Sequence, residues 1–378
     1  MTDRERRLTV LSFGSPDRVP LEPGNGREST LRRWHAEGLP VELTGGEAVA
    51  AFAYRAAGGR EELPAAGEGF PVDLRMIPQF EEKVLERRGG TQVVQDWKGN
   101  VCEIGAEFDP TYLSSPRDFV TRRWIRCPVE SRSDWLDIAR RYDPADPARL
   151  PGDAADRARR LADRSWMVSL EIPGPFWQLR EWLGFERLCT LFYDDLPFLR
   201  QLLGFWSTFV ALVLERTFRL FVPDEIHVSE DMAFKGFSMI SPAMVREHLL
   251  PVWTRWGKLI REAGCPVYAM DSDGFVGELI PLWIEAGITA CDPVEVAAGN
   301  DIATFRARFA RRMAFRGGVD KRAIAKGGAA IEGEIDRIRP VIASGGYIPG
   351  CDHGVPSDVS WPDYVRYVGL LARATGWI

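Results

Sequence analysis

Short apolar or β-branched runs alternate with longer helical patterns over most of the chain. Continuous apolar runs of this kind are typical of parallel strands that lie buried under helices. The repeated strand-helix order indicates βα units, and eight such strands predict one closed (β/α)₈ (TIM) barrel of the α/β class. The predicted strands are 19–22, 73–77, 166–172, 225–229, 266–270, 290–294, 313–317 and 346–349. The predicted helices that follow the later strands are 242–263, 277–286, 302–311, 331–342 and 361–375.

Two segments depart from this repeat. Residues 93–105 hold two extended runs around Lys98-Gly99-Asn100, which predicts an inserted β-hairpin. Residues 127–165 are rich in Pro, Asp and Arg, and their pattern predicts a helical insertion on the surface with little core. Neither segment has the size of a separate domain, so we expect residues 1–378 to form a single barrel domain.

The amino-acid composition of the chain argues against nucleic acid and membranes as binding partners. The chain has 378 residues with 48 basic and 54 acidic side chains, a net charge of −6, so no basic field is expected for nucleic acid. Six cysteines without a Cys-x-x-Cys pair and a charged N-terminus predict a reducing, cytoplasmic setting. The most apolar run, near 199–222, is interrupted by Glu215, Arg216 and Arg219, which favours a buried helix over a membrane span.

Ionisable residues follow nearly every predicted strand. In a barrel the active site lies at the carboxyl ends of the strands, where the βα loops begin, so these residues are candidates for chemistry. The clearest are Glu230-Asp231, the pair Asp271 and Asp273, and His353, an imidazole suited to exchanging protons near neutral pH. Asp273 has a simpler alternative role as the cap of the next helix.

Aromatic residues near strand ends suggest a pocket for a flat substrate. Trp177 and Phe234 are the candidates for its walls, and Lys235 follows Phe234 directly. Because acids gather at one end of the predicted barrel, we expect the pocket to favour a cationic or metal-bound substrate.

Four sequence motifs, in this order and spacing, resemble the uroporphyrinogen decarboxylase family, which includes cobalamin-linked methyltransferases. The resemblance covers roughly residues 10–375 and is stronger in the C-terminal half. The motifs are Ser15-Pro16-Asp17-Arg18-Val19-Pro20, Ser229-Glu230-Asp231-Met232-Ala233, Gly317-Gly318-Val319-Asp320 and His353-Gly354-Val355-Pro356.

The decarboxylases of that family imply a cofactor-free barrel, and we take this activity as the first expectation, with an organic acid other than the usual porphyrinogen as substrate. Their first-loop motif Arg-Gln-Ala-Gly-Arg reads Asn25-Gly26-Arg27-Glu28-Ser29 here, so fewer arginines are present for a substrate with many carboxylates. The resemblance implies that Arg27 takes an arginine position, that His353 matches the family's histidine and that Glu230-Asp231 replaces an Asp-Ser pair. Together with the position of residues after the strands, we expect catalytic roles for His353, Asp231 and Asp271. The residues expected to bind substrate are Arg27, Asn25, Glu230, Trp177, Phe234 and Lys235.

The methyltransferases of the family imply an alternative. Asp271 and Asp273 stand where their His-x-Cys zinc ligands occur, and Cys351 lies near the third ligand position. The expected reaction is then metal-assisted methyl transfer between a small methylated substrate and a corrinoid on a partner protein, with a divalent metal such as zinc. A third alternative is a non-catalytic barrel that binds a tetrapyrrole or a partner protein. The family also implies a homodimer.

Overall fold

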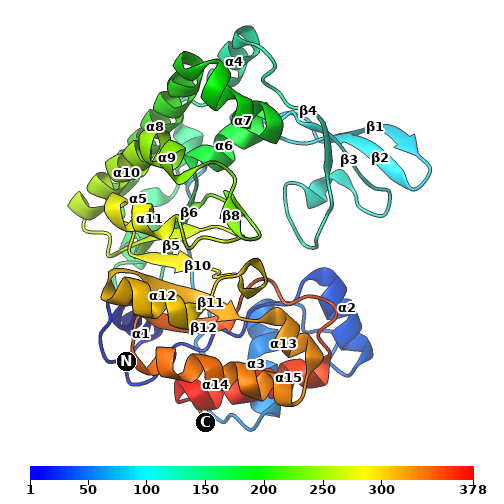
Figure 1. Ribbon diagram of the computed structural model, residues 1–378, viewed down its shortest axis with the longest axis vertical. Helices are drawn as coiled ribbons and strands as arrows, with labels where there is room; N and C mark the ends of the chain where they lie inside the picture. Colours follow the sequence, from blue (N-terminus) through cyan, green and yellow to red (C-terminus); the bar gives the residue numbers. More distant parts are fainter.

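The computed structural model describes residues 1–378, and its centre is a six-stranded parallel sheet (Figure 1). The strand order is β12-β11-β10-β9-β6-β5, and each neighbouring pair is parallel. The α/β class is therefore confirmed. The strands are β5 (Ser169–Pro173), β6 (Glu225–Ser229), β9 (Val267–Asp271), β10 (Ala290–Asp292), β11 (Ala314–Val319) and β12 (Tyr347–Cys351).

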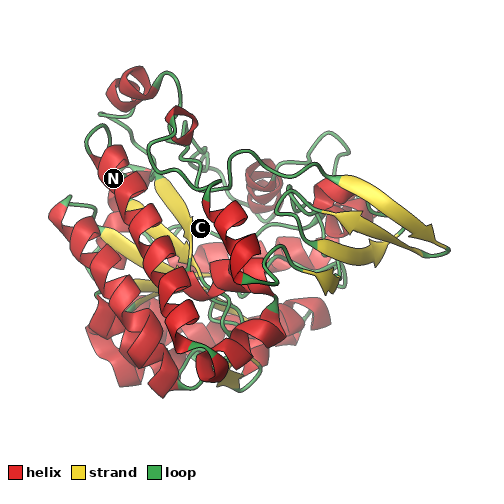
Figure 2. Cartoon of the chain, turned by 90° about the horizontal axis from the view of Figure 1, so that it is seen from above, coloured by secondary structure: helices red, strands yellow, loops and turns green.

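Helices cover this sheet, and a separate four-stranded antiparallel sheet projects from the helical body (Figure 2). The helices of the first half are α1 (Asp3–Leu11), α2 (Glu28–Ala36), α3 (Gly46–Ala56), α4 (Arg132–Ala139), α5 (Ala154–Arg160), α6 (Pro175–Leu183), α7 (Phe185–Asp194) and α8 (Leu196–Phe218). Those of the second half are α9 (Pro242–Met244), α10 (Leu250–Glu262), α11 (Ile280–Ala286), α12 (Ile302–Phe309), α13 (Lys321–Lys326), α14 (Ala329–Ala343) and α15 (Trp361–Thr375).

The first two predicted strands are not regular strands, and the sheet does not close into an eight-stranded ring. Residues 19–26 run beside β12 with only an isolated parallel bridge between Gly26 and Val355 and one bond from the Cys351 N–H to the Pro23 carbonyl. Prolines at 20 and 23 have no N–H to donate to a strand ladder, which explains the irregular edge.

Residues 73–77 are tied to the insertion instead of to a neighbouring strand. The N–H of Asp73 donates to the carbonyl of Arg149, and the N–H of Ile77 donates to the carbonyl of Arg141. The prediction of two strands here was wrong because the apolar pattern reports burial, whereas the backbone groups found their partners outside the sheet.

The hairpin prediction is confirmed and extended. β2 (Thr91–Gln95) and β3 (Val101–Gly105) pair antiparallel, and β1 (Lys83–Arg88) and β4 (Arg123–Arg126) complete the projecting sheet. The 127–165 insertion contributes more to the core than its composition predicts, because Trp135, Ile138 and Tyr142 are buried in the main cluster.

One cluster of 77 buried apolar residues joins the outer face of the sheet to the helices. α8 runs through it, and although its length and composition would allow it to cross a membrane, more than half of its apolar window is buried inside the molecule. A smaller cluster of Val10 and Leu11 with the small strand residues Ala269, Ala290 and Ala314 fills the amino-terminal end of the sheet. The opposite end, called the carboxyl edge below, is left to polar groups.

Candidate active site at the carboxyl edge of the sheet

A chain of polar contacts crosses the carboxyl edge and centres on His353, which follows β12. Arg27 Nη2 lies 2.9 Å from His353 Nδ1, and the N–H of Gly354 lies 2.7 Å from the same nitrogen. Two donors on Nδ1 make it the acceptor, so Nε2 carries the proton and donates to Asp273 Oδ2 at 3.2 Å. The surroundings therefore select one tautomer of His353 and aim its N–H at a carboxylate.

The chain continues from Asp273 to Asp231, which follows β6. The N–H of Asp273 donates to Asp231 Oδ1 at 3.0 Å. Burial and the nearby charge of Asp273 raise the pKa of Asp231. Burial acts in the same direction on Asp273, but the hydrogen bond from His353 and the positive charges of its surroundings outweigh it and lower the pKa. The two neighbouring carboxyls are thus pushed towards different protonation states, an arrangement typical of acid-base sites.

Asp271 ends β9 and is aligned with Ser229 of β6 and Asp292 of β10, so its side chain shares their face of the sheet. Burial together with the charges of Asp292 and Asp231 raises its pKa well above the usual value. Asp271 is therefore a carboxyl group whose protonated form is favoured by its surroundings, next to the contacts just described.

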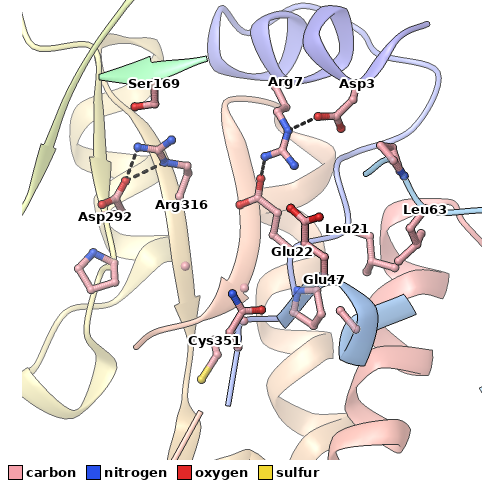
Figure 3. Close-up of a pocket in the computed structure, with 18 of the residues that line it drawn as sticks. Asp3, Arg7, Leu21, Glu22, Glu47, Leu63, Ser169, Asp292, Arg316 and Cys351 are labelled. Atoms are coloured by element: carbon pink, nitrogen blue, oxygen red, sulfur yellow. Dashed lines mark hydrogen bonds and ion pairs between the residues drawn. The ribbon is translucent and has the colours of Figure 1, made fainter. Parts of the chain in front are cut away.

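The face of the sheet that carries Asp271 also holds a compact network of charged side chains. His227 Nε2 lies 2.9 Å from Asp292 Oδ1, and Arg316 Nε donates to Asp292 Oδ2 at 2.7 Å. Arg316 also bridges to Glu225 at 2.8 Å. Burial opposes the charged form of His227, but Asp292 outweighs it and raises the His227 pKa to about 9. These charged groups line a cavity of about 520 Å³ between the sheet and residues 21–25, shown with Arg316 and Asp292 in Figure 3.

The acids of the predicted mouth have partners or surroundings that reduce their negative charge. Glu295 pairs with Lys321 at 2.9 Å, and burial raises the pKa of Asp352 to about 6. Asp273 is bonded to His353, and burial raises the pKa values of Asp231 and Asp271. The preference of the pocket for a cationic or metal-bound substrate stays a prediction.

Glu230 lies apart from the site although it precedes Asp231 directly. Its side chain is fully buried, and one oxygen accepts from the N–H of Phe176 at 2.7 Å while the other has no partner. Burial raises its pKa well above the usual value. Gly174 makes room for it, since a Cβ there would lie 1.1 Å from Glu230 Oε2. The position fits a neutral structural acid and leaves no surface for a substrate.

The three residues expected as metal ligands do not come together. No group of three or more His, Cys, Asp or Glu side chains is arranged to hold a metal ion. Cys351 belongs to the main apolar cluster, and burial raises its thiol pKa to about 12, which disfavours the thiolate that metals bind. Asp273 is engaged with His353. These residues do not fit the metal site of the alternative, and no step below depends on one.

The other residues that the sequence predicts to bind substrate lie outside the group of contacts around His353. Asn25 is exposed and lines the cavity near 21–25. Phe234 and Lys235 lie at the exposed tip of the short hairpin of β7 (Ala233–Phe234) and β8 (Phe237–Ser238). Trp177 lines a second cavity, described below.

Sequence reasoning missed the network of Glu225, His227, Asp292 and Arg316. The signal was present in the alternation along β6, where Glu225, His227 and Ser229 fall on one face. A histidine inside a predicted strand gives no reason to assign it a functional role, since nothing in the sequence shows that Asp292 and Arg316 stand on the two strands that complete the network.

Comparison with solved structures shows what fold this is. The chain is similar to a methyltransferase from Methanosarcina mazei with a TM-score of 0.57 and 13% identity over 99% of both chains. It is also aligned with a B12-independent methionine synthase from Shewanella sp. W3-18-1, with a TM-score of 0.42, 12% identity and coverage of 95% and 97%. No protein-family model matches the chain, and no curated protein sequence matches it.

At 13% identity the first similarity shows a shared fold, to which the whole chain contributes. It agrees with the α/β architecture that the sequence resemblance implied. Membership of the uroporphyrinogen decarboxylase family, the homodimer and the cytoplasmic setting stay predictions.

Proposed function

We propose that this protein transfers a methyl group between a small methylated substrate and a corrinoid carried by a separate protein. The observation that carries the proposal is the pair of protonatable carboxyls, Asp231 and Asp271, beside the His353–Asp273 couple at the ends of neighbouring strands. Support for methyl transfer over decarboxylation comes from the fold, which is shared with a methyltransferase, whereas nothing found here favours loss of CO₂.

Methyl transfer from an oxygen or nitrogen atom needs a proton donor. When the bond between the methyl carbon and its oxygen or nitrogen breaks, the electron pair stays on the heteroatom, and the methyl group bonds to cobalt(I) of the corrinoid, which supplies the new electron pair. The departing heteroatom becomes basic and takes up a proton. Asp271, whose pKa is raised by burial and by neighbouring carboxylates, is assigned as the donor, and general acid catalysis of this kind contributes about 10²–10⁴-fold.

The other residues prepare that step. Arg27 and Gly354 fix the tautomer of His353, whose Nε2–H favours the ionised form of Asp273, and burial together with the charge of Asp273 raises the pKa of Asp231. Asp231 is then placed to return a proton to Asp271 after each transfer. In the reverse direction the same carboxyls accept the proton of the group that receives the methyl.

The test uses free methylcob(III)alamin in the dark under anaerobic conditions, with a thiol, a phenol and an amine as acceptors. We expect protein-dependent loss of its absorbance with at least one acceptor, and a rate lowered about 100-fold in Asp271→Asn. Asp336→Asn, on the exposed face of α14, is the matched control. Release of CO₂ from organic acids without any methyl transfer would replace the proposal with the decarboxylase activity, and inactivity in both assays would favour a binding function.

A further inference from the structure

A second cavity, of about 500 Å³, lies between residues 71–75 and the start of α6, beside the end of β5. Two indole rings, Trp97 and Trp177, form part of its wall. Lys98 Nζ lies between them, 5.1 Å from the Trp97 ring centre and 5.9 Å from that of Trp177. The volume is in the range of small-molecule sites, and flat indole walls select flat ligands.

The wall of this cavity holds a buried arginine without a counter-ion. Arg149 is 1% exposed, and its guanidinium donates only to backbone carbonyls, among them Asp143 at 3.1 Å, Asp73 at 3.2 Å and Arg141 at 3.1 Å. No carboxylate lies within ion-pair distance of it. These neutral acceptors satisfy its donors. The charges of Asp73, Asp146 and Asp143 favour the guanidinium from beyond ion-pair distance, but burial outweighs them and lowers the Arg149 pKa.

The neighbourhood of Lys98 also has more cations than carboxylates. Lys98 pairs with the buried Glu181, but the same carboxylate faces Arg122 and Arg180 as well. Neither of these two arginines has a carboxylate within 4 Å, and Arg180 stacks on Trp177 at 4.2 Å. Three cations therefore share one carboxylate beside the indole walls. The cavity lining adds two carboxylates, Glu171 and Asp73, of which Asp73 pairs with Arg75, so cations still outnumber carboxylates in this group of residues.

The cavity leads towards the candidate active site. Glu171 of β5 lines it and accepts a hydrogen bond from Ser229 Oγ at 2.7 Å, and Ser229 is aligned with Asp271. β6 lies between β5 and β9, and neighbouring strands are about 4.8 Å apart, so β5 and β9 are separated by about 10 Å. A single substituted ring in the cavity would therefore cover much of the distance to Asp271.

We propose that this cavity binds an aromatic ring bearing a carboxylate, with the ring against Trp97 and Trp177 and the carboxylate held by the positive field of Arg149 and Lys98. The ligand supplies the charge that the cavity lacks. The inference deepens the proposed function and rests on it only in identifying this ring as the methyl-bearing substrate.

The experiment is isothermal titration calorimetry of the full-length protein with benzoate, benzamide and cyclohexanecarboxylate. We expect benzoate to bind most tightly, because benzamide lacks the charge and cyclohexanecarboxylate lacks the flat ring. Trp177→Leu should weaken benzoate several-fold to about tenfold. Arg75→Ala, which removes a partly exposed cation of the lining, should weaken it less. Trp124→Leu, at a partly exposed indole outside the cavity, is the matched control and should leave the affinity unchanged.

Equal affinities for the three ligands, no benzoate binding, or unchanged affinity in a folded Trp177→Leu protein would each overturn the inference. A circular dichroism melt of each variant separates loss of the site from loss of the fold. Turnover is measured separately with 4-methoxybenzoate as methyl donor to cob(I)alamin. Binding without turnover would leave this inference standing and count against the proposed function, and methyl transfer from an aliphatic donor without benzoate binding would do the reverse.

Discussion

The buried His227–Asp292 pair should make the stability of the protein depend on pH above neutrality. Its His227 pKa is raised from 6.5 to about 9, since Asp292 more than offsets the cost of burial. A group whose pKa is higher in the folded state stabilises that state fully below its unfolded pKa, and this contribution is lost as the pH rises through its folded pKa. At 1.36 kcal/mol per unit, the shift corresponds to about 3 kcal/mol, which should disappear between pH 6.5 and 9.

The perturbation is His227→Gln, which keeps a polar side chain of similar reach but cannot titrate. Free energies of unfolding from urea titrations at pH 6, 7.5 and 9 should fall by about 3 kcal/mol more in the wild type than in the variant. The control is His35→Gln on α2, where the ring contacts only the Leu39 carbonyl and should leave the wild-type profile intact. Parallel pH profiles for wild type and His227→Gln would refute the assignment of a charged imidazolium to this pair.

Other parts of the molecule give further expectations. Arg316→Met should destabilise by about 3–5 kcal/mol, measured by urea unfolding, because it leaves Asp292 and Glu225 without their shared cation; a loss below 1 kcal/mol would contradict the pairing. Glu230→Gln should leave the melting temperature nearly unchanged because burial disfavours the charged acid and the amide oxygen can still accept from the Phe176 N–H, whereas Gly174→Ala should lower it by the equivalent of about 1–3 kcal/mol through the clash with Glu230. The loop 106–122 is held to α2 by Ser29 and Asp118 at 2.8 and 2.9 Å, so limited proteolysis within it should speed up in Asp118→Ala but not in the exposed Asp358→Ala. Since Cys351 is buried away from Asp271 and Asp273, Zn²⁺ should raise the melting temperature of the wild type no more than that of Cys351→Ser, and a larger rise in the wild type would restore the metal site.

The second half of the fold could be predicted because sequence-local signals and tertiary packing agree there. The run predicted at 225–229 is β6 itself, and the later runs differ from the observed strands by at most two residues at either end. The first two predicted strands were wrong, because the runs at 19–22 and 73–77 lie against the molecule without being paired in the sheet. Their conformation depends on contacts between residues far apart in the sequence. Residues 19–22 contain a proline and run beside β12, and residues 73–77 are held by the insertion, where Arg149 donates to the carbonyls of Asp73 and Arg141.

The candidate site could also be predicted only in part. Position after a strand was enough to locate Asp231, Asp271, Asp273 and His353, since the carboxyl ends of parallel strands meet at one edge. Direction within the strand was harder to predict. Glu230 is fully buried and accepts from the Phe176 N–H, although the next residue, Asp231, takes part in the site. Cys351 packs in the apolar cluster and also lines the cavity of Figure 3.

Arg149 has a consequence for how such a protein diversifies. It connects residues 73–77 to the 127–165 segment through side-chain bonds to backbone carbonyls, so the insertion makes part of the wall of the second cavity, whereas Asp231 and Asp271 follow or end other strands. Substitutions in the insertion can therefore reshape what the cavity accepts without disturbing the acid-base residues. Selection on substrate and selection on chemistry would act on separate stretches of the gene, and related proteins should differ most between residues 71 and 165 while their strand ends stay alike.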